Sequence, residues 1–364
     1  MVEEKINIKS LNREDLLEFL VNKGFKKFRA DQIFKWIYAH YARSFDEMTN
    51  ISKLERAQLA SNFYIPSPKV IKSEASWDGT EKFLFELVDG RTIESVLIPD
   101  EERLTLCISS QVGCRQACRF CLTGSGGFTR DLKAYEIVDQ VSEVSRILRD
   151  KGTGGITNIV LMGMGEPLAN FDEVVKAIKL ITSSTGLGVS PRRVTISTDG
   201  LVPEIKKLGS SGLKVNLAVS LNATTDEVRD EIMPVNKRYP IKDLLAACKR
   251  FPLEPRRRIT FEYVLLRGVN DSVEDAQRLT KLLRSIKCKI NLIPFNPFSG
   301  CEFKRPDDAA VKRFQKILLA AHYTAPIRES RGRDISAACG QLREQVEFAS
   351  GQLISQREKS KPIF

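Results

Sequence analysis

Three cysteines within eight residues are the part of this sequence best suited to chemistry. Cys114, Cys118 and Cys121 stand four and then three residues apart. Thiolates are the usual ligands of iron–sulfur clusters, and three of them leave one metal with an open coordination position. The alternatives are a zinc knuckle or buried reduced thiols. A structural zinc site needs four ligands, however, and neither His40 nor His322 is near in the sequence. The spacing therefore favours a cluster that takes part in a reaction.

A second run, Gly163-Met-Gly-Glu-Pro, also has residue types suited to a ligand site. Its glycines let the backbone approach a ligand closely, and Glu166 can accept a hydrogen bond from a ligand ammonium group. An ordinary turn after a strand would look similar. Its position shortly after the cysteine run gives weight to the ligand-binding interpretation.

Alternating β-rich and helical patterns from residue 104 onward would position both runs. The predicted strands are 104–109, 158–162, 193–197, 215–220, 259–265 and 290–294, and the predicted helices are 134–149, 172–182, 203–208, 241–249 and 273–286. Six β-α units with such connections predict an α/β fold in which a parallel sheet curves into an open barrel, because eight units would close it. Ligands of such folds bind at the carboxyl ends of the strands, where both runs fall.

The composition limits the class of protein. The chain has 364 residues, 42% of them hydrophobic, and carries 57 Lys and Arg against 46 Asp and Glu, a net charge of +11. This surplus favours polyanions such as RNA, although many basic proteins bind none. No segment approaches the roughly 20 apolar residues of a membrane span, and the N-terminus lacks the pattern of a signal peptide. We expect a cytoplasmic protein with no membrane partner.

The region before the barrel divides into two parts. Residues 1–66 predict helices over 15–23 and 30–41, with basic residues on their flanks that indicate either a solvated face or a nucleic-acid-binding module. Residues 67–99 contain Asp89-Gly90 between two β-rich runs, which predicts a β-hairpin.

The two runs together resemble the radical S-adenosylmethionine (SAM) superfamily. This resemblance implies a partial (βα)6 barrel, a [4Fe–4S] cluster on Cys114, Cys118 and Cys121, and SAM bound to the unique iron through its amino and carboxylate groups. Further segments resemble the RlmN methyltransferases, which methylate C2 of an adenosine in 23S rRNA and in certain tRNAs. These segments are 93–99, 107–114, 192–198, 291–297 and 337–342.

The RlmN resemblance assigns roles to three further residues. It implies that Cys339 carries the methyl group as S-methylcysteine and forms a covalent intermediate with the RNA. It implies that Cys107 releases the product through a transient disulfide with Cys339, and that Glu94 accepts a proton. Without the resemblance, Cys339 would be interpreted as a small buried thiol and Glu94 as an outward-facing hairpin residue. An adenine C2–H is neither acidic nor nucleophilic enough for direct methyl transfer, so a covalent radical route divides a difficult step.

The resemblance also implies a set of SAM contacts. They are Gly165, Glu166, Ser197, Ser220, Leu221, Asn222 and Asn296. The chain departs from the family pattern at two positions, because the family commonly has histidine in place of Asn222 and serine in place of Asp199. Asparagine can still donate and accept hydrogen bonds, so we expect SAM binding to be retained.

The partners implied are 23S rRNA, tRNA and an electron donor such as flavodoxin or ferredoxin. The nearest alternative is methylation of adenosine C8 in 23S rRNA, as in the Cfr group. Pro167, where Cfr-like sequences tend to have alanine, and the run Arg331-Gly-Arg-Asp favour C2. Two alternatives from other classes are a non-catalytic RNA-binding protein stabilised by zinc and a radical enzyme acting on a small metabolite.

We therefore expect four parts in the chain. Residues 1–66 form a small helical accessory domain that binds RNA, and 67–99 form the β-hairpin extension. Residues 100–335 form the radical SAM core barrel, and 336–364 form a C-terminal segment that carries Cys339.

Overall fold

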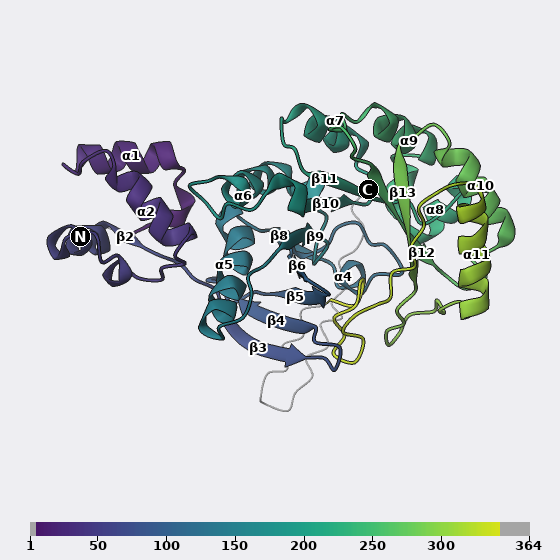
Figure 1. The fold of residues 1–364 in the computed structure, drawn as a ribbon, viewed down its shortest axis with the longest axis horizontal. Coiled ribbons are helices and arrows are strands. Elements are labelled where there is room, and N and C mark those ends of the chain that lie inside the picture. The colour runs from purple at the N-terminus through teal and green to yellow at the C-terminus, as the bar shows by residue number, and fades with distance from the viewer. Residues whose placement is uncertain (1–4, 343–364) are drawn as a thin grey trace, which may run out of the picture.

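The computed structural model describes residues 5–342. Its centre is a nine-stranded sheet in the order β13-β12-β11-β10-β9-β6-β5-β4-β3. The six strands from β13 to β6 run parallel and curve into an open barrel (Figure 1). These strands are β6 (Arg103–Cys107), β9 (Asn158–Leu161), β10 (Val194–Thr198), β11 (Asn216–Ser220), β12 (Ile259–Leu265) and β13 (Cys288–Pro294). The predicted partial (βα)6 barrel is confirmed.

Helices cover the outer face of this barrel (Figure 1). They are α5 (Ala134–Asp150), α6 (Phe171–Thr182), α7 (Val202–Ser210), α8 (Asp226–Ile232), α9 (Ile241–Arg250), α10 (Val273–Leu283) and α11 (Asp308–Ala320). The sequence patterns did not predict α8 and α11. In α10, the apolar residues Ala276, Leu279 and Leu283 are fully buried, three and four positions apart, so this face packs on the sheet.

The two faces of β10 and β11 differ in polarity. In β10, Val194 and Ile196 are fully buried beneath the helices, whereas Ser197 is partly exposed. In β11, Leu217 is likewise buried and Ser220 partly exposed. Because successive side chains of a strand point to opposite faces, the polar residues face the interior of the barrel. Polar side chains therefore line the barrel interior at the carboxyl ends of these strands.

An antiparallel extension continues the sheet beyond β6. It consists of β3 (Lys69–Ala75), β4 (Glu81–Glu86) and β5 (Thr92–Asp100). The hairpin of β4 and β5 agrees with the prediction, and Gly90 in its turn has a φ of +76°, which suits glycine. The sequence did not predict β3, which lies at the edge of the sheet and exposes most of its residues.

A helical module precedes this extension and lies to one side of the barrel (Figure 1). It contains β1 (Ile6–Asn7), α1 (Arg13–Asn22), α2 (Arg29–Tyr38), α3 (Lys53–Asn62) and β2 (Phe63–Tyr64). Lys9 donates to Asp139 of α5 at 2.6 Å in a buried ion pair, and Arg43 pairs with Glu143 of the same helix. These contacts attach the module to the barrel.

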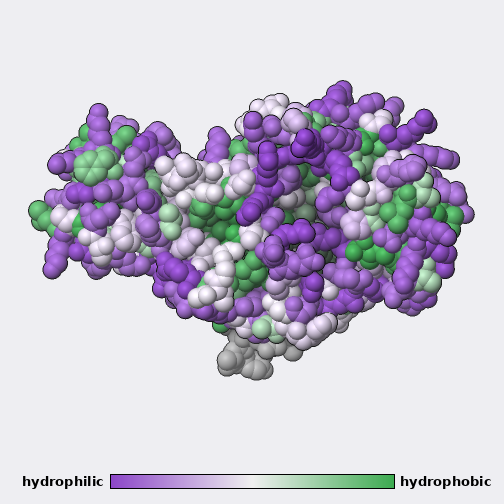
Figure 2. Space-filling model, in the orientation of Figure 1, coloured by the Kyte–Doolittle hydropathy of each residue, from purple (hydrophilic) through white to green (hydrophobic). Residues whose placement is uncertain are grey.

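The surface of the molecule is mainly hydrophilic, and apolar residues gather in recessed parts of the face shown in Figure 2. Within residues 5–342, no helix has the length and apolar character needed to cross a membrane.

Candidate active site

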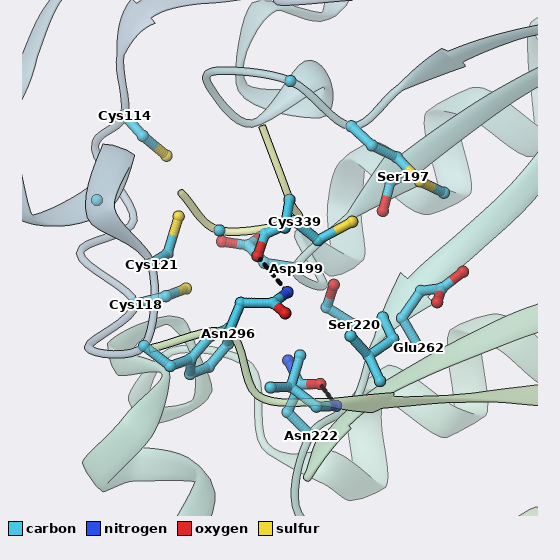
Figure 3. Close-up of a pocket in the computed structure, with 18 of the residues that line it drawn as sticks. Cys114, Cys118, Cys121, Ser197, Asp199, Ser220, Asn222, Glu262, Asn296 and Cys339 are labelled. Carbon is cyan, nitrogen blue, oxygen red and sulfur yellow. Dashed lines mark hydrogen bonds between the residues drawn. The ribbon is translucent and has the colours of Figure 1, made fainter. Parts of the chain in front are cut away.

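One cavity opens at the carboxyl ends of the barrel strands, and most of the predicted site residues line it (Figure 3). Leu221 is fully buried beside it, and Cys107 and Glu94 are buried in β6 and β5. The predicted residues in the lining are Cys114, Cys118, Cys121, Gly165, Glu166, Ser197, Ser220, Asn222, Asn296 and Cys339.

The cluster loop, residues 114–127, is closed by a short local ladder. β7 (Gln111–Gly113) and β8 (Phe128–Asp131) pair antiparallel on either side of it, and the Cys114 N–H donates to the Gly127 carbonyl at 2.7 Å. Gly113 has a φ of +76°, and a Cβ there would lie 2.1 Å from that carbonyl oxygen. Only glycine therefore fits at the base of the loop.

The three cysteines of this loop point into the cavity from the same side (Figure 3). Burial raises the pKa of Cys114 to about 12 and also raises the pKa values of Cys118 and Cys121. Metal binding would therefore displace thiol protons, because sulfur binds metals as the thiolate. Each thiolate of a [4Fe–4S] cluster binds a different iron, and three convergent sulfur donors fit that requirement.

The glycine-rich loop after β9 packs directly on the segment that leads into the cluster loop. A Cβ on Gly163 would lie 2.7 Å from Ser109 Oγ, and one on Gly165 would lie 2.5 Å from Gln111 Cβ. The Glu166 N–H donates to Gln111 Oε1 at 2.9 Å. Both predicted motifs are thus built into one unit, and glycine is required where the two backbones meet.

Two buried carboxyl groups stand side by side in the cavity wall. Glu166 Oε1 accepts from the Leu168 N–H at 2.9 Å, and Glu166 Oε2 accepts from the Asp199 N–H at 2.8 Å. Burial and the neighbouring Asp199 hold the pKa of Glu166 well above its usual range, and burial raises the pKa of Asp199 to about 6. A hydrogen bond between the two carboxyls requires that one keeps its proton. When both are ionised, the pair forms a site for a group that donates hydrogen bonds or carries positive charge.

Arg229 of α8 lies fully buried behind these residues. Its guanidinium donates to the carbonyls of Asp199 at 2.6 Å, Ser220 at 3.1 Å and Leu221 at 3.0 Å. Carbonyls at strand ends lack ladder partners, so one planar five-donor group satisfies several of them. Arg229 therefore positions the ends of β10 and β11 relative to each other.

Asn222 has a structural task in addition to its predicted role. Its φ is +57°, a conformation that asparagine tolerates better than most residues. Its Oδ1 accepts from the Val264 N–H of β12 at 2.8 Å, and its Nδ2 lies 3.2 Å from Met233 Sδ. The amide therefore joins β11 to β12 at the cavity wall, and its contact with SAM stays a prediction.

Cys339 reaches the same cavity on a loop from the other end of the chain. In this Cys339 loop, residues 332–342, the Gly340 carbonyl accepts from the Leu122 N–H at 2.7 Å. The Cys339 carbonyl accepts from Asn296 Nδ2 at 3.2 Å (Figure 3). The thiol is accessible because it faces the cavity, although the surrounding protein raises its pKa. The rest of the predicted segment 336–364 lies outside the described residues.

The turn between β3 and β4 holds the first half of the Cys339 loop. The Gly332 N–H donates to Asp78 Oδ2 at 2.9 Å, and Ser76 Oγ donates to Asp334 Oδ1 at 2.5 Å. A Cβ on Gly332 would lie 2.8 Å from Ala337 Cβ and 2.9 Å from Thr80 Cγ2. The antiparallel extension thus supports the loop that carries Cys339.

Cys107 and Glu94 lie on the neighbouring strands of the sheet. Cys107 pairs in register with Val96, and burial and the adjacent Cys339 raise its pKa to about 12. Glu94 is buried and lies 3.2 Å from the Lys82 ammonium group. The outward-facing interpretation of Glu94 is therefore wrong, because Ser95 faces α5 through its bond to Gln140 and Glu94 occupies the opposite face.

The sequence patterns missed three charged residues at this site, namely Arg229, Glu262 and Arg328. Glu262 and Arg328 line the cavity, and Glu262 Oε1 accepts from Asn291 Nδ2 at 2.9 Å. Glu262 stands within an apolar strand run, which was the available signal. Arg229 lies in a charged helical segment typical of a surface, so the sequence carried no signal of its burial.

Comparisons with known proteins agree with this geometry. Residues 6–65 match the ribosomal RNA large subunit methyltransferase N-terminal domain, and residues 108–280 match the radical SAM superfamily. The chain is 55% identical over 346 residues to the dual-specificity RNA methyltransferase RlmN of Pelobacter propionicus, covering 95% of this chain and 98% of that protein. It is 54% identical to the RlmN of Geotalea uraniireducens, covering 95% of this chain and 99% of that protein.

A solved structure is also similar. The crystal structure of a radical SAM methyltransferase from Sphaerobacter thermophilus matches with a TM-score of 0.88 and 44% sequence identity, covering 93% of this chain and 99% of that chain. The likeness extends over the N-terminal module, the extension and the barrel together.

Proposed function

The chain belongs to the RlmN family of dual-specificity RNA methyltransferases, and from this premise we propose that it methylates C2 of an adenosine in 23S rRNA and in certain tRNAs. As a radical SAM enzyme it uses a [4Fe–4S] cluster and SAM. When bound, the cluster supplies the electron that cleaves SAM to a 5′-deoxyadenosyl radical. Cys114, Cys118 and Cys121 hold the cluster, and the residues of the neighbouring strand ends hold SAM.

The observation that carries this proposal is the position of Cys339. It lies more than 200 residues from the cluster cysteines in the sequence, yet its thiol faces the cavity that they line. A thiol in that position can accept a methyl group. Once that S-methyl group has given up a hydrogen atom to the 5′-deoxyadenosyl radical, its methylene carbon can bond to an RNA base that enters the cavity. The loop backbone, bonded to Leu122 and Asn296, holds the sulfur at the reacting position.

Cys107 and Glu94 complete the proposed reaction. Breaking the Cys339–RNA bond requires removal of the C2 proton and release from sulfur. Cys107 is the thiol that adjoins Cys339, so its sulfur bonds to the Cys339 sulfur as the bond between that sulfur and the methylene carbon breaks. The methylene carbon takes up a proton to become the methyl group, Glu94 accepts the C2 proton, and the one electron left over would return to the bound cluster. The Lys82 ammonium group lies 3.2 Å from the Glu94 carboxylate, and a carboxylate is the form that a base requires.

RNA docking and reduction belong to the same proposal. Lys23, Lys26, Lys27 and Lys35 of the N-terminal module are exposed, whereas Arg29 is paired with Glu55. We therefore assign the exposed lysines to contacts with rRNA and tRNA phosphates. We expect a donor such as flavodoxin or ferredoxin to reduce the cluster in the cytoplasm.

The deciding experiment identifies the modified nucleoside. The chain is expressed in a bacterial strain that lacks its own adenosine C2 methyltransferase, and its rRNA and tRNA are digested and analysed by mass spectrometry and chromatography. We expect 2-methyladenosine in both RNA pools. Formation of 8-methyladenosine would instead support the Cfr-like alternative and contradict the proposal.

Two cysteine variants test the proposed roles within the reaction. Cys339→Ala should keep its iron and its SAM affinity but form neither product nor RNA adduct. Cys107→Ala should accumulate a covalent protein–RNA adduct, which is visible on a denaturing gel. Wild-type turnover by Cys107→Ala would contradict the proposed role of Cys107 in product release.

A further inference from the structure

Asp199 has two carboxylate oxygens without hydrogen-bond donors in the wall of the cavity. Only 7% of the residue is exposed, and neither Oδ1 nor Oδ2 accepts a hydrogen bond from an N–H or hydroxyl group within residues 5–342. The Glu166 carboxyl can bond to Asp199 only while one of the two keeps its proton. A buried carboxylate without donors is costly, so the side chain is suited to a ligand. We propose that Asp199 binds the α-amino group of SAM as a second carboxylate beside Glu166, an inference that rests on the SAM site of the proposed function.

The position of Asp199 identifies the end of the ligand that it meets. The Asp199 N–H donates to Glu166 Oε2 at 2.8 Å, and both residues line the cavity that the three cluster cysteines enter. Asp199 therefore lies at the cluster end of the cavity, as Figure 3 also shows. In radical SAM enzymes, which this chain resembles, the amino and carboxylate groups of SAM occupy that end. A carboxylate of the protein would repel the ligand carboxylate, which leaves the amino group.

The chemistry of the sulfonium and of the amino group of SAM also points to the amino group as the partner. A sulfonium carries charge but has no hydrogen to donate, whereas an amino nitrogen bound to iron keeps two N–H hydrogens. The two oxygens of Asp199 lack N–H and hydroxyl donors. The amino group supplies the missing donors, and a sulfonium would leave them missing.

Glu166 and Asp199 then have distinct tasks. Both oxygens of Glu166 already accept backbone N–H groups, from Leu168 and Asp199, so its orientation is fixed by the protein. Asp199 keeps its lone pairs available. Arg229 binds the Asp199 carbonyl at 2.6 Å and its charge favours the ionised carboxyl, which allows a carboxylate at this buried position.

The test measures ligand affinity in the cluster-loaded protein, prepared anaerobically and without RNA. Dissociation constants of wild type, Asp199→Asn and Asp199→Ser are measured for SAM, S-adenosylhomocysteine and 5′-methylthioadenosine. We expect both variants to bind SAM and S-adenosylhomocysteine roughly tenfold to a hundredfold more weakly, the loss of a charge-assisted hydrogen bond. 5′-Methylthioadenosine lacks the amino group, so its affinity should be unchanged.

Each other outcome overturns the assignment. Weaker binding of SAM alone would make the sulfonium the partner, and equal weakening of 5′-methylthioadenosine would place Asp199 at the adenosine. Loss of iron from both variants would make Asp199 a cluster residue, and unchanged affinities would remove any role in binding. Asp139→Asn, which alters a buried carboxylate outside the cavity, is the matched control and should bind SAM as wild type does. Failure of C2 methylation leaves these affinities unaffected, so the two proposals fail separately.

Discussion

The cluster loop and the Cys339 loop face the same cavity. The first is closed by contacts between residues near in sequence, and the second is held by contacts between residues far apart in sequence. The cluster loop is closed by its own neighbours, through the β7–β8 ladder and the bond from Cys114 to Gly127. The Cys339 loop is held across 219 residues by Thr123 and Leu342, and across 258 residues by Ser76 and Asp334. The base of the cluster loop is thus set by local contacts, although Leu122 and Thr123 of this loop also bond to the Cys339 loop. The position of Cys339, in contrast, depends on the whole fold. Variants should therefore separate iron content from methyl transfer.

The largest effect is expected from removing a cluster ligand. Cys118→Ala should lose most of the iron and reduce methylation below detection, because two thiolates hold a cluster poorly. Iron and sulfide analysis and the brown colour of the anaerobic protein would measure this. Cys301→Ala is the matched control, since this thiol lies beside the cluster loop at Arg119 but outside the main cavity lining. A colourless Cys301→Ala protein would contradict the assignment of three ligands.

The local character of the cluster loop is tested at its glycines. Gly113→Ala combines a φ of +76° with a Cβ placed 2.1 Å from the Gly127 carbonyl oxygen. It should lower the free energy of unfolding by about 2–4 kcal/mol and reduce iron content. Gly127→Ala has a φ of +83° but no atom within 4 Å of its Cβ, so it should cost only about 1 kcal/mol. Equal losses of stability in the two variants would show that the positive φ, and not the clash with the Gly127 carbonyl, causes the destabilisation.

The corresponding change in the Cys339 loop should leave the metal in place. Gly332→Ala would push its Cβ against Ala337 and Thr80 at 2.8 and 2.9 Å. We expect normal iron content, a destabilisation of about 1–3 kcal/mol and a fall in methyl transfer of roughly tenfold or more, as expected for a displaced reacting group. Gly300→Ala is the control, because Gly300 has a φ of +83°, close to the +65° of Gly332, but no atom within 4 Å of its Cβ. Iron loss in Gly332→Ala would show that the two loops are not independent.

The smallest effect expected is a pH-dependent change in stability from Asp78, which accepts a hydrogen bond from Gly332 of the Cys339 loop. Burial raises the pKa of Asp78, but hydrogen bonds from Thr80, Gly332 and Ser76 outweigh it and lower the value to about 2 from 3.8. A carboxyl with a lowered pKa stabilises the fold above its unfolded value, and this contribution is lost as pH falls through about 2. Wild type should therefore exceed Asp78→Asn in unfolding free energy above pH 4, by less than about 1 kcal/mol because solvent screens the group. Urea unfolding from pH 6 downward should show that the difference in unfolding free energy between wild type and Asp78→Asn becomes smaller. A difference that stays constant with pH would exclude ionisation of Asp78 as its cause.

The sequence predicted the barrel well because parallel strands buried on one or both faces appear as continuous apolar runs. β12 was predicted with its observed limits, Ile259–Leu265. β3 was missed because this edge strand, Lys-Val-Ile-Lys-Ser-Glu-Ala, shows no regular alternation of apolar and polar residues. β7 and β8 were missed because strands of three or four residues owe their existence to the loop that they close.

The site was predictable to the extent that its residues act through local spacing. The spacing of Cys114, Cys118 and Cys121 within eight residues is enough to predict a set of metal ligands. Cys339 was predicted only through the resemblance to the RlmN methyltransferases. Arg229 could not be found because its burial is set by strand-end carbonyls that only the folded chain brings together. The division of the chain into four parts and the roles of the site residues stay predictions.

The range of the contacts at the Cys339 loop has a consequence for the order of biosynthesis. The Thr123 hydroxyl and its acceptor, the Leu342 carbonyl, are separated by 219 residues, so the cluster loop leaves the ribosome long before the segment that packs against it. We expect the cysteine loop to remain open to the iron-delivery machinery during this interval. Cys339 then docks last, so its thiol is absent from the cavity until residues 332–342 have been made.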